Sequence, residues 1–160
     1  MNLSATGLRL ISEFEGLYLT GYLCSAGRPT IGWGHTGSVD GVPVRAGMVI
    51  TKEKAIELLA ADMVSFEDSV KSLTKIEPTQ NQFDALVSLA FNIGAGALGG
   101  STLLRMFNAG KIQGAADQFL VWDKYTDPRT GEKKVSAGLV RRRKSERHLF
   151  LTGELNFFER

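Results

Sequence analysis

The distribution of glycine and proline constrains this chain more than any other feature of its sequence. Seven of the 18 glycines and two of the four prolines fall between Gly21 and Gly47. The β-prone pieces in and beside this stretch, at residues 18–20, 29–34 and 42–44, are short. Short pieces of this kind, separated by glycine-rich turns, predict a small twisted sheet or hairpin lobe.

The remaining chain shows helical spacing of its apolar residues. A short amphipathic helix is expected from near Thr6, with Glu15 near its apolar face. A long helix is expected to open at Thr51 and to run to about residue 73. Further helices are expected at 79–93, 101–107, 112–122 and 136–152, with a turn at 127–131. Helices combined with one small β lobe predict an α+β fold.

Glu15, Cys24 and Thr30 follow the spacing E-x8-C-x5-T and form a candidate catalytic group. A carboxyl group beside an apolar helix face is partly desolvated, which raises its pKa and allows it to donate a proton to a leaving oxygen near neutral pH. The ordinary alternatives are a solvated glutamate and a cysteine that serves as a small buried hydrophobic residue. The fixed spacing of the three residues favours catalysis.

The run EGLYLTGYLCSAGRPTIGWGHT resembles the lysozymes of tailed phages, glycoside hydrolase family 24, whose pattern is E-x8-D-x5-T followed by TIGxGHT. The resemblance continues through ITKEKAIELLAADM, NQFDALVSLAFNIGAGALGGSTLLR, AADQFLVW and GLVRRRKSERHLF, so it covers nearly the whole chain. It implies a single lysozyme-like catalytic domain, 1–160. Its lobes are expected at roughly 15–50 and 75–160 plus the N-terminal helix, with a connecting helix at 51–74 and a cleft between the lobes.

The resemblance also implies the reaction, which is cleavage of the β-1,4 bond between N-acetylmuramic acid and N-acetylglucosamine in peptidoglycan, for lysis of the host cell. Glu15 is the implied general acid. Cys24 stands where most relatives have aspartate, which with help from the threonine orients a water molecule. Two routes stay open: Cys24 acts as base or water-orienting group with inversion, or it attacks C1 with retention through a thioglycoside.

Further substrate contacts are expected at Gly34, His35, Phe91, Asn92 and Gln118. Each has a simpler structural explanation, such as a bulge for the glycine, the protein core for the phenylalanine or a helix cap for the asparagine. By the resemblance, His35 is also expected to pair with Asp62.

Composition limits the other possibilities. The 160 residues are 43% apolar and 22% charged, which is typical of one globular domain. One cysteine allows no internal disulfide, and two distant histidines make no zinc site, so no metal and no cofactor are expected. The N-terminus shows no signal peptide, so synthesis is expected in the host cytoplasm and action in the periplasm. For this family a holin pore gives access to the wall, and we expect a monomer.

A basic cluster on the last expected helix raises the question of nucleic acid. The cluster comprises Arg141, Arg142, Arg143, Lys144, Arg147 and His148. Consecutive helical positions point in all directions and the net charge is only +2, so no nucleic-acid partner is expected. One of these arginines, buried between the lobes, is a candidate ion-pair partner of Glu15.

Three alternatives to a muramidase remain at this point. A cell-wall peptidase would use Cys24 and His35 as a catalytic pair, which leaves Glu15 and Thr30 without a role. A relative that has lost catalysis would bind wall fragments without cleaving them. A helical nucleic-acid binder would show salt-dependent affinity for DNA.

Overall fold

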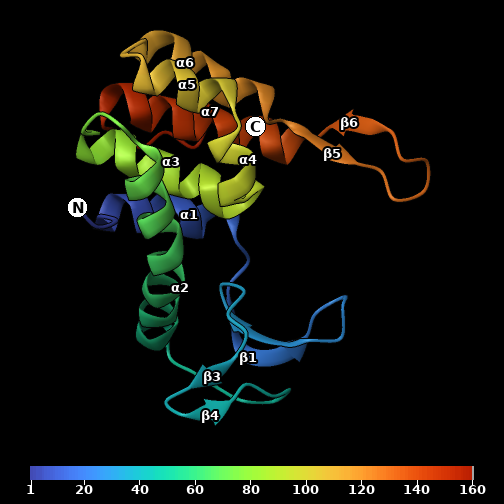
Figure 1. Cartoon of the computed structure of the whole chain (residues 1–160). Helices are drawn as coiled ribbons and strands as arrows, with labels where there is room; N and C mark the ends of the chain where they lie inside the picture. Colours follow the sequence, from blue (N-terminus) through green and yellow to red (C-terminus); the bar gives the residue numbers. More distant parts are fainter. Residues whose placement is uncertain (160) are drawn as a thin grey trace. The chain divides into compact units, whose positions relative to one another are not determined.

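The computed structural model describes Met1–Glu159, which form two compact units. The β-unit is Ile11–Ser65, and the helical unit combines Met1–Leu10 with the chain from Phe66 onward. Helices α1 (Ala5–Phe14) and α2 (Lys52–Leu73) each begin in one unit and end in the other (Figure 1). The expected α+β class with a lysozyme-like arrangement of helices and small antiparallel sheets is confirmed.

The β-unit contains two short antiparallel hairpins. Their strands are β1 (Tyr18–Leu23) with β2 (Pro29–Gly32), and β3 (Ser38–Val39) with β4 (Val42–Pro43). The strands end early because the connecting turns contain glycines with positive φ, among them Gly34 at 82° and Gly41 at 81°. The glycine-rich stretch thus forms the small lobe that the sequence predicts.

Strand β1 pairs with β2 only at its two ends. Tyr18 lies opposite Gly32 and Tyr22 opposite Thr30, and the register is irregular between these pairs. There the middle of β1 bonds to another segment: the Gly21 N–H donates to the Met48 carbonyl at 2.6 Å. A methyl group at Gly21 would lie 2.1 Å from the Arg45 carbonyl oxygen. Only glycine permits this approach of the two backbones.

We therefore expect Gly21→Ala to lower the free energy of unfolding by about 3 kcal/mol, the upper end of the range for overpacking, because the added methyl group meets rigid backbone. Urea denaturation measures the change. Gly96→Ala is the matched control, since its methyl group meets nothing within 4 Å and should change stability by less than about 1 kcal/mol. Equal stability of Gly21→Ala and the parent protein would show that the segment can move aside at no cost.

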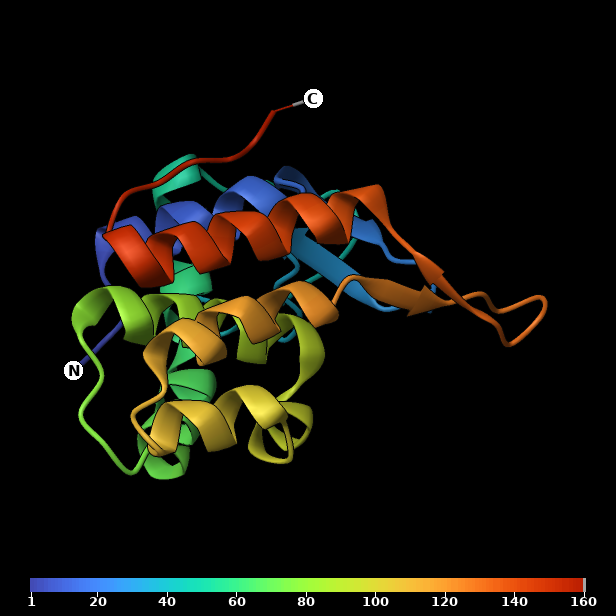
Figure 2. The same cartoon turned by 90° about the horizontal axis from the view of Figure 1, so that it is seen from above.

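The helical unit is built around α3 (Gln80–Ile93), in which every residue from 83 to 90 is buried. Helix α7 (Ala137–Thr152) packs against α3, and both contribute side chains to the core. Figure 2 shows the helices of this unit from above. The Phe150 ring of α7 lies 6.1 Å from Phe107 and 5.3 Å from Phe119, measured between ring centroids. The remaining helices are α4 (Ala95–Gly99), α5 (Thr102–Asn108), α6 (Ile112–Gln118) and the 3-10 helix η1 (Phe119–Val121).

Local signals set the helix ends. Thr79 forms a capping box with Gln82, Ser136 caps α7, and Gly153 ends α7 with a left-handed φ of 78°. These ends were expected. Helix α4 and the hairpin of β5 (Lys124–Thr126) and β6 (Lys133–Val135) were not, and the expected turn at 127–131 is the loop of this hairpin, which extends away from the helices of its unit (Figure 1).

Part of the basic cluster is buried, as expected for consecutive helical positions that point in different directions. The exposed fractions of Arg143 and Glu146 are 0%, and that of Arg142 is 4%. Arg143 Nε lies 2.7 Å from Glu146 Oε1, and Arg142 Nε lies 3.3 Å from Glu146 Oε2. The Ser88 hydroxyl of α3 also donates to Glu146 Oε2, so this carboxylate joins α7 to the central helix.

We expect Glu146→Gln to lower the free energy of unfolding by about 3–5 kcal/mol, because it removes the carboxylate charge that faces the fully buried Arg143 guanidinium group. Urea denaturation at neutral pH measures the loss. Glu154→Gln is the control, since Glu154 is exposed and its neutralisation should have little effect. A loss below about 1 kcal/mol would mean that the two arginines find other compensation.

Candidate active site

Cys24 opens the tight loop that connects β1 to β2. Its N–H donates to the Arg28 carbonyl at 3.0 Å, and the Gly27 N–H donates to the Cys24 carbonyl at 2.8 Å. Gly27 has a φ of 76°, which this reversal of the chain requires. The thiol is therefore held by a closed hairpin loop, and its side chain is half-buried.

The loop lowers the pKa of the Cys24 thiol. The backbone amides of Arg28 and Ala26 make the largest contributions because they hydrogen-bond to the sulfur, and partial burial opposes them. The Thr30 hydroxyl and the Arg28 charge lower the pKa further. The thiolate fraction near neutral pH is thus larger than that of an ordinary cysteine.

Thr30 lies on β2 and is almost completely buried. Its hydroxyl donates to the Arg28 carbonyl at 2.9 Å and also lies within hydrogen-bonding reach of the Cys24 sulfur. The structure therefore brings the second and third members of the expected group together. The spacing C-x5-T is the spacing of a hairpin, with cysteine before the turn and threonine after it.

Glu15 is half-buried and belongs to the same unit as Cys24 and Thr30. The sequence predicted that Glu15 lies on the first helix. This prediction is wrong, because α1 ends at Phe14 and Glu15 is the first residue after it. Gly16 follows and is a poor helix former, which accounts for the early end. The carboxyl group thus starts the segment that leads into β1.

The expected pair of His35 and Asp62 is confirmed. His35 Nδ1 lies 2.9 Å from Asp62 Oδ2, and Nε2 lies 2.9 Å from the Ser38 carbonyl oxygen. Both ring nitrogens thus have oxygen partners at 2.9 Å, and the Cys24 sulfur is not one of them. This arrangement disfavours the cysteine-histidine peptidase. Gly34, next to His35, is exposed in the turn that follows β2.

The other expected substrate contacts belong to the helical unit, so they are not brought together with Cys24 in one unit. Phe91 is half-buried near the end of α3, with its ring 5.4 Å from that of Phe66 in a T-shaped contact. Asn92 is exposed beside it, and Gln118 is half-buried at the end of α6. Their roles in substrate binding stay predictions.

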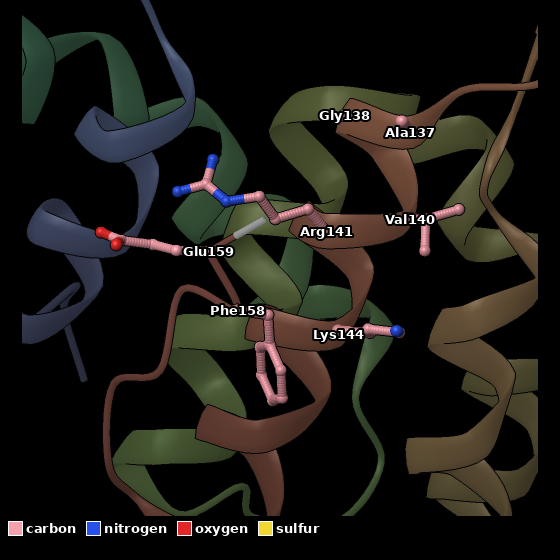
Figure 3. A pocket seen from close by; sticks show the side chains of 7 residues that line it. All are labelled: Ala137, Gly138, Val140, Arg141, Lys144, Phe158 and Glu159. Atoms are coloured by element: carbon pink, nitrogen blue, oxygen red, sulfur yellow. The ribbon is translucent and has the colours of Figure 1, made fainter.

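A pocket of about 530 Å³ lies elsewhere in the helical unit, beside α7, and none of the expected site residues lines it. Its lining comprises Ala137, Gly138, Val140, Arg141, Lys144, Phe158 and Glu159. The side chains of Arg141 and Lys144 point in opposite directions (Figure 3), so the two cations do not converge on one ligand. Within Met1–Glu159, no three His, Cys, Asp or Glu side chains are grouped to hold a metal ion, and no helix is both long and apolar enough to span a bilayer.

Sequence reasoning missed the backbone donors of the site. The amides of Ala26 and Arg28 do most to lower the pKa of Cys24, yet no side-chain pattern marks a backbone N–H. The one available signal was the hairpin spacing of Cys24 and Thr30, which places a turn, and therefore unpaired amides, beside the thiol.

Comparison with known proteins identifies the family of this chain. Residues 12–146 match the phage lysozyme family. The endolysin of Salmonella phage P22 is 47% identical over 95% of this chain and 99% of its own length. The endolysin of Bacillus phage B103 is 49% identical over 96% of this chain, which spans only 56% of that protein. A solved endolysin of Escherichia coli O157:H7 phage FAHEc1 is 44% identical, with a TM-score of 0.87 over 98% of this chain and 97% of its own.

The family match and these relatives define a glycoside hydrolase of the lysozyme class. The chain belongs to the phage lysozyme family. It is accordingly a muramidase of the endolysin kind.

The lowered pKa of Cys24 predicts fast alkylation. The rate of reaction with iodoacetamide should rise with pH through a midpoint below about 8.5, the ordinary value for cysteine, because only the thiolate reacts. Thr30→Val should move the midpoint upward, since it removes the hydroxyl that lowers the pKa of the thiol. Thr20→Val, at an exposed position of β1, should leave it unchanged. A midpoint at or above that of free cysteine would contradict the assigned environment.

Proposed function

We propose that Glu15, Cys24 and Thr30 together cleave the β-1,4 bond between N-acetylmuramic acid and N-acetylglucosamine in bacterial peptidoglycan. The observation that carries this proposal is the environment of Cys24, where two backbone amides and the Thr30 hydroxyl favour a thiolate. A thiolate presents an anion where the relatives of the family present a carboxylate. The substitution of the usual aspartate is therefore compatible with catalysis.

The reaction starts with proton transfer from the Glu15 carboxyl group to the bridging oxygen, while the bond from C1 to that oxygen breaks. Positive charge develops at C1 and its ring oxygen, and the Cys24 thiolate stabilises this charge. In the inverting route water adds to C1 and gives its proton to the thiolate, with Thr30 orienting the water. In the retaining route the sulfur bonds to C1 as the leaving oxygen departs; water then gives a proton to the Glu15 carboxylate and bonds to C1, and the sulfur leaves as thiolate. The configuration of the product, read by NMR, distinguishes the routes.

The role in lysis follows from family membership. The substrate is the cell wall, and we infer that the enzyme is made in the host cytoplasm and acts in the periplasm as a monomer. A holin-type pore is the partner that gives it access. Gly34, His35, Phe91, Asn92 and Gln118 stay proposed substrate contacts.

Clearing of a Gram-negative peptidoglycan suspension tests the assignment. Glu15→Gln should lower the rate about 10²–10⁴-fold, the usual contribution of a general acid. Cys24→Ser should be similarly impaired, whereas Cys24→Asp should stay within about tenfold of the parent because it restores an anion. Glu53→Gln is the control, since Glu53 is exposed at the start of α2.

Mass analysis of the soluble products completes the test. Fragments that end in muramic acid support the muramidase assignment. Clearing by Glu15→Gln, with cut peptides and intact glycan, would overturn it in favour of a peptidase. Wall binding without any clearing by the parent protein would overturn it in favour of a relative that has lost catalysis.

A further inference from the structure

Strand β1 presents two aromatic rings on one face. The ring centroids of Tyr18 and Tyr22 are 4.4 Å apart, and the rings are inclined at 45°. Tyr18 is 51% exposed, although it is a large ring in a strand that lies beside a core. Nothing in the packing of the β-unit requires an aromatic side chain at so exposed a position.

One end of this pair adjoins Cys24. Tyr22 lies directly opposite Thr30 in the hairpin, so the two side chains share a face of the sheet. The Cys24 sulfur lies within hydrogen-bonding reach of the Thr30 hydroxyl, which brings the thiol next to the residue that Tyr22 pairs with. Partial burial raises the pKa of Tyr22, and the negative charges of Tyr18 and Cys24 raise it further.

The other end of the pair adjoins Glu15. The Tyr18 ring lies over Gly16, where an added methyl group would come within 3.2 Å of Tyr18 Cε2. Glycine at this position leaves room for the ring. Since Gly16 follows Glu15 directly, the two rings extend from the neighbour of the proposed acid to the neighbour of the thiol.

We propose that Tyr18 and Tyr22 form a stacking subsite for one hexosamine ring of the glycan strand, next to the bond that Glu15 and Cys24 cleave. This inference rests on the proposed function. Sugar rings have an apolar face of C–H groups, and exposed aromatic rings bind such faces at low cost in side-chain entropy. The phenol hydroxyls at the edge of the rings can hydrogen-bond to sugar hydroxyls. The position of the rings beside the reacting groups favours the glycan over any other occupant.

Steady-state kinetics on soluble glycan strands freed of their peptides test the subsite. Tyr18→Ala should raise KM about five- to tenfold and leave kcat within about twofold, because the ring binds substrate without taking part in bond cleavage. Tyr18→Phe should behave like the parent protein, since it keeps the ring. Leu23→Ala is the matched control: Leu23 lies on the same strand, is 60% exposed, and faces the other side of the sheet.

Direct binding separates this inference from the assignment of the reaction. Calorimetric titration of Glu15→Gln with the same glycan strands should show a similar loss of affinity when Tyr18→Ala is added. A Tyr18→Ala protein with the KM and affinity of the parent would overturn the subsite, even if Glu15→Gln is inactive. An active Glu15→Gln protein would overturn the assigned reaction instead. Tyr22→Ala is a second test of the subsite, provided that circular dichroism shows that the variant is folded. If it is not folded, the KM and affinity of Tyr18→Ala alone test the subsite, because Tyr18 is exposed.

Discussion

The close approach of two backbones at Gly21 determines the form of the β-unit. Because no side chain separates Gly21 from Arg45, the middle of β1 bonds to the segment that ends the lobe, and only the ends of β1 pair with β2. One short strand therefore belongs to two pairings. Its first end lies just after Glu15, and its last end opens the loop of Cys24. Strand β1 thus separates Glu15 from Cys24 along the chain, and the approach at Gly21 fixes the position of this strand.

The local part of this fold could be predicted from sequence, and the reasons are physical. Helix caps such as Thr79 and Ser136 bond to a backbone N–H three residues later. A cap can therefore be recognised from a few consecutive residues of the sequence. The hairpin of β5 and β6 was missed because its short strands carry three lysines and no alternating apolar pattern. The buried pair of Arg143 and Glu146 was missed because charges spaced by three residues are also typical of a solvated helix.

The candidate site shows the same division. The spacing of Cys24 and Thr30 was sufficient to bring these two residues together, since it is the spacing of a hairpin. The place of Glu15 beside them stays a prediction. The pKa of the thiol depends on the backbone amides of Ala26 and Arg28. A backbone amide does not depend on the side chain, so the residue types do not reveal it. The charge state of Cys24 is therefore a property of loop conformation, and it required the three-dimensional structure.

The single cysteine makes the proposed catalytic group sensitive to oxidation. A half-buried thiolate of lowered pKa is the form of cysteine that peroxides oxidise first, to a sulfenic acid and then to irreversible acids. With one cysteine in the chain, no second thiol can trap the first oxidation product as an internal disulfide and so allow its repair. An aspartate in the same loop would not be oxidised in this way. If Cys24 acts as we propose, each molecule that leaves a reducing compartment thus carries in its own catalytic group the thiol whose oxidation ends its activity.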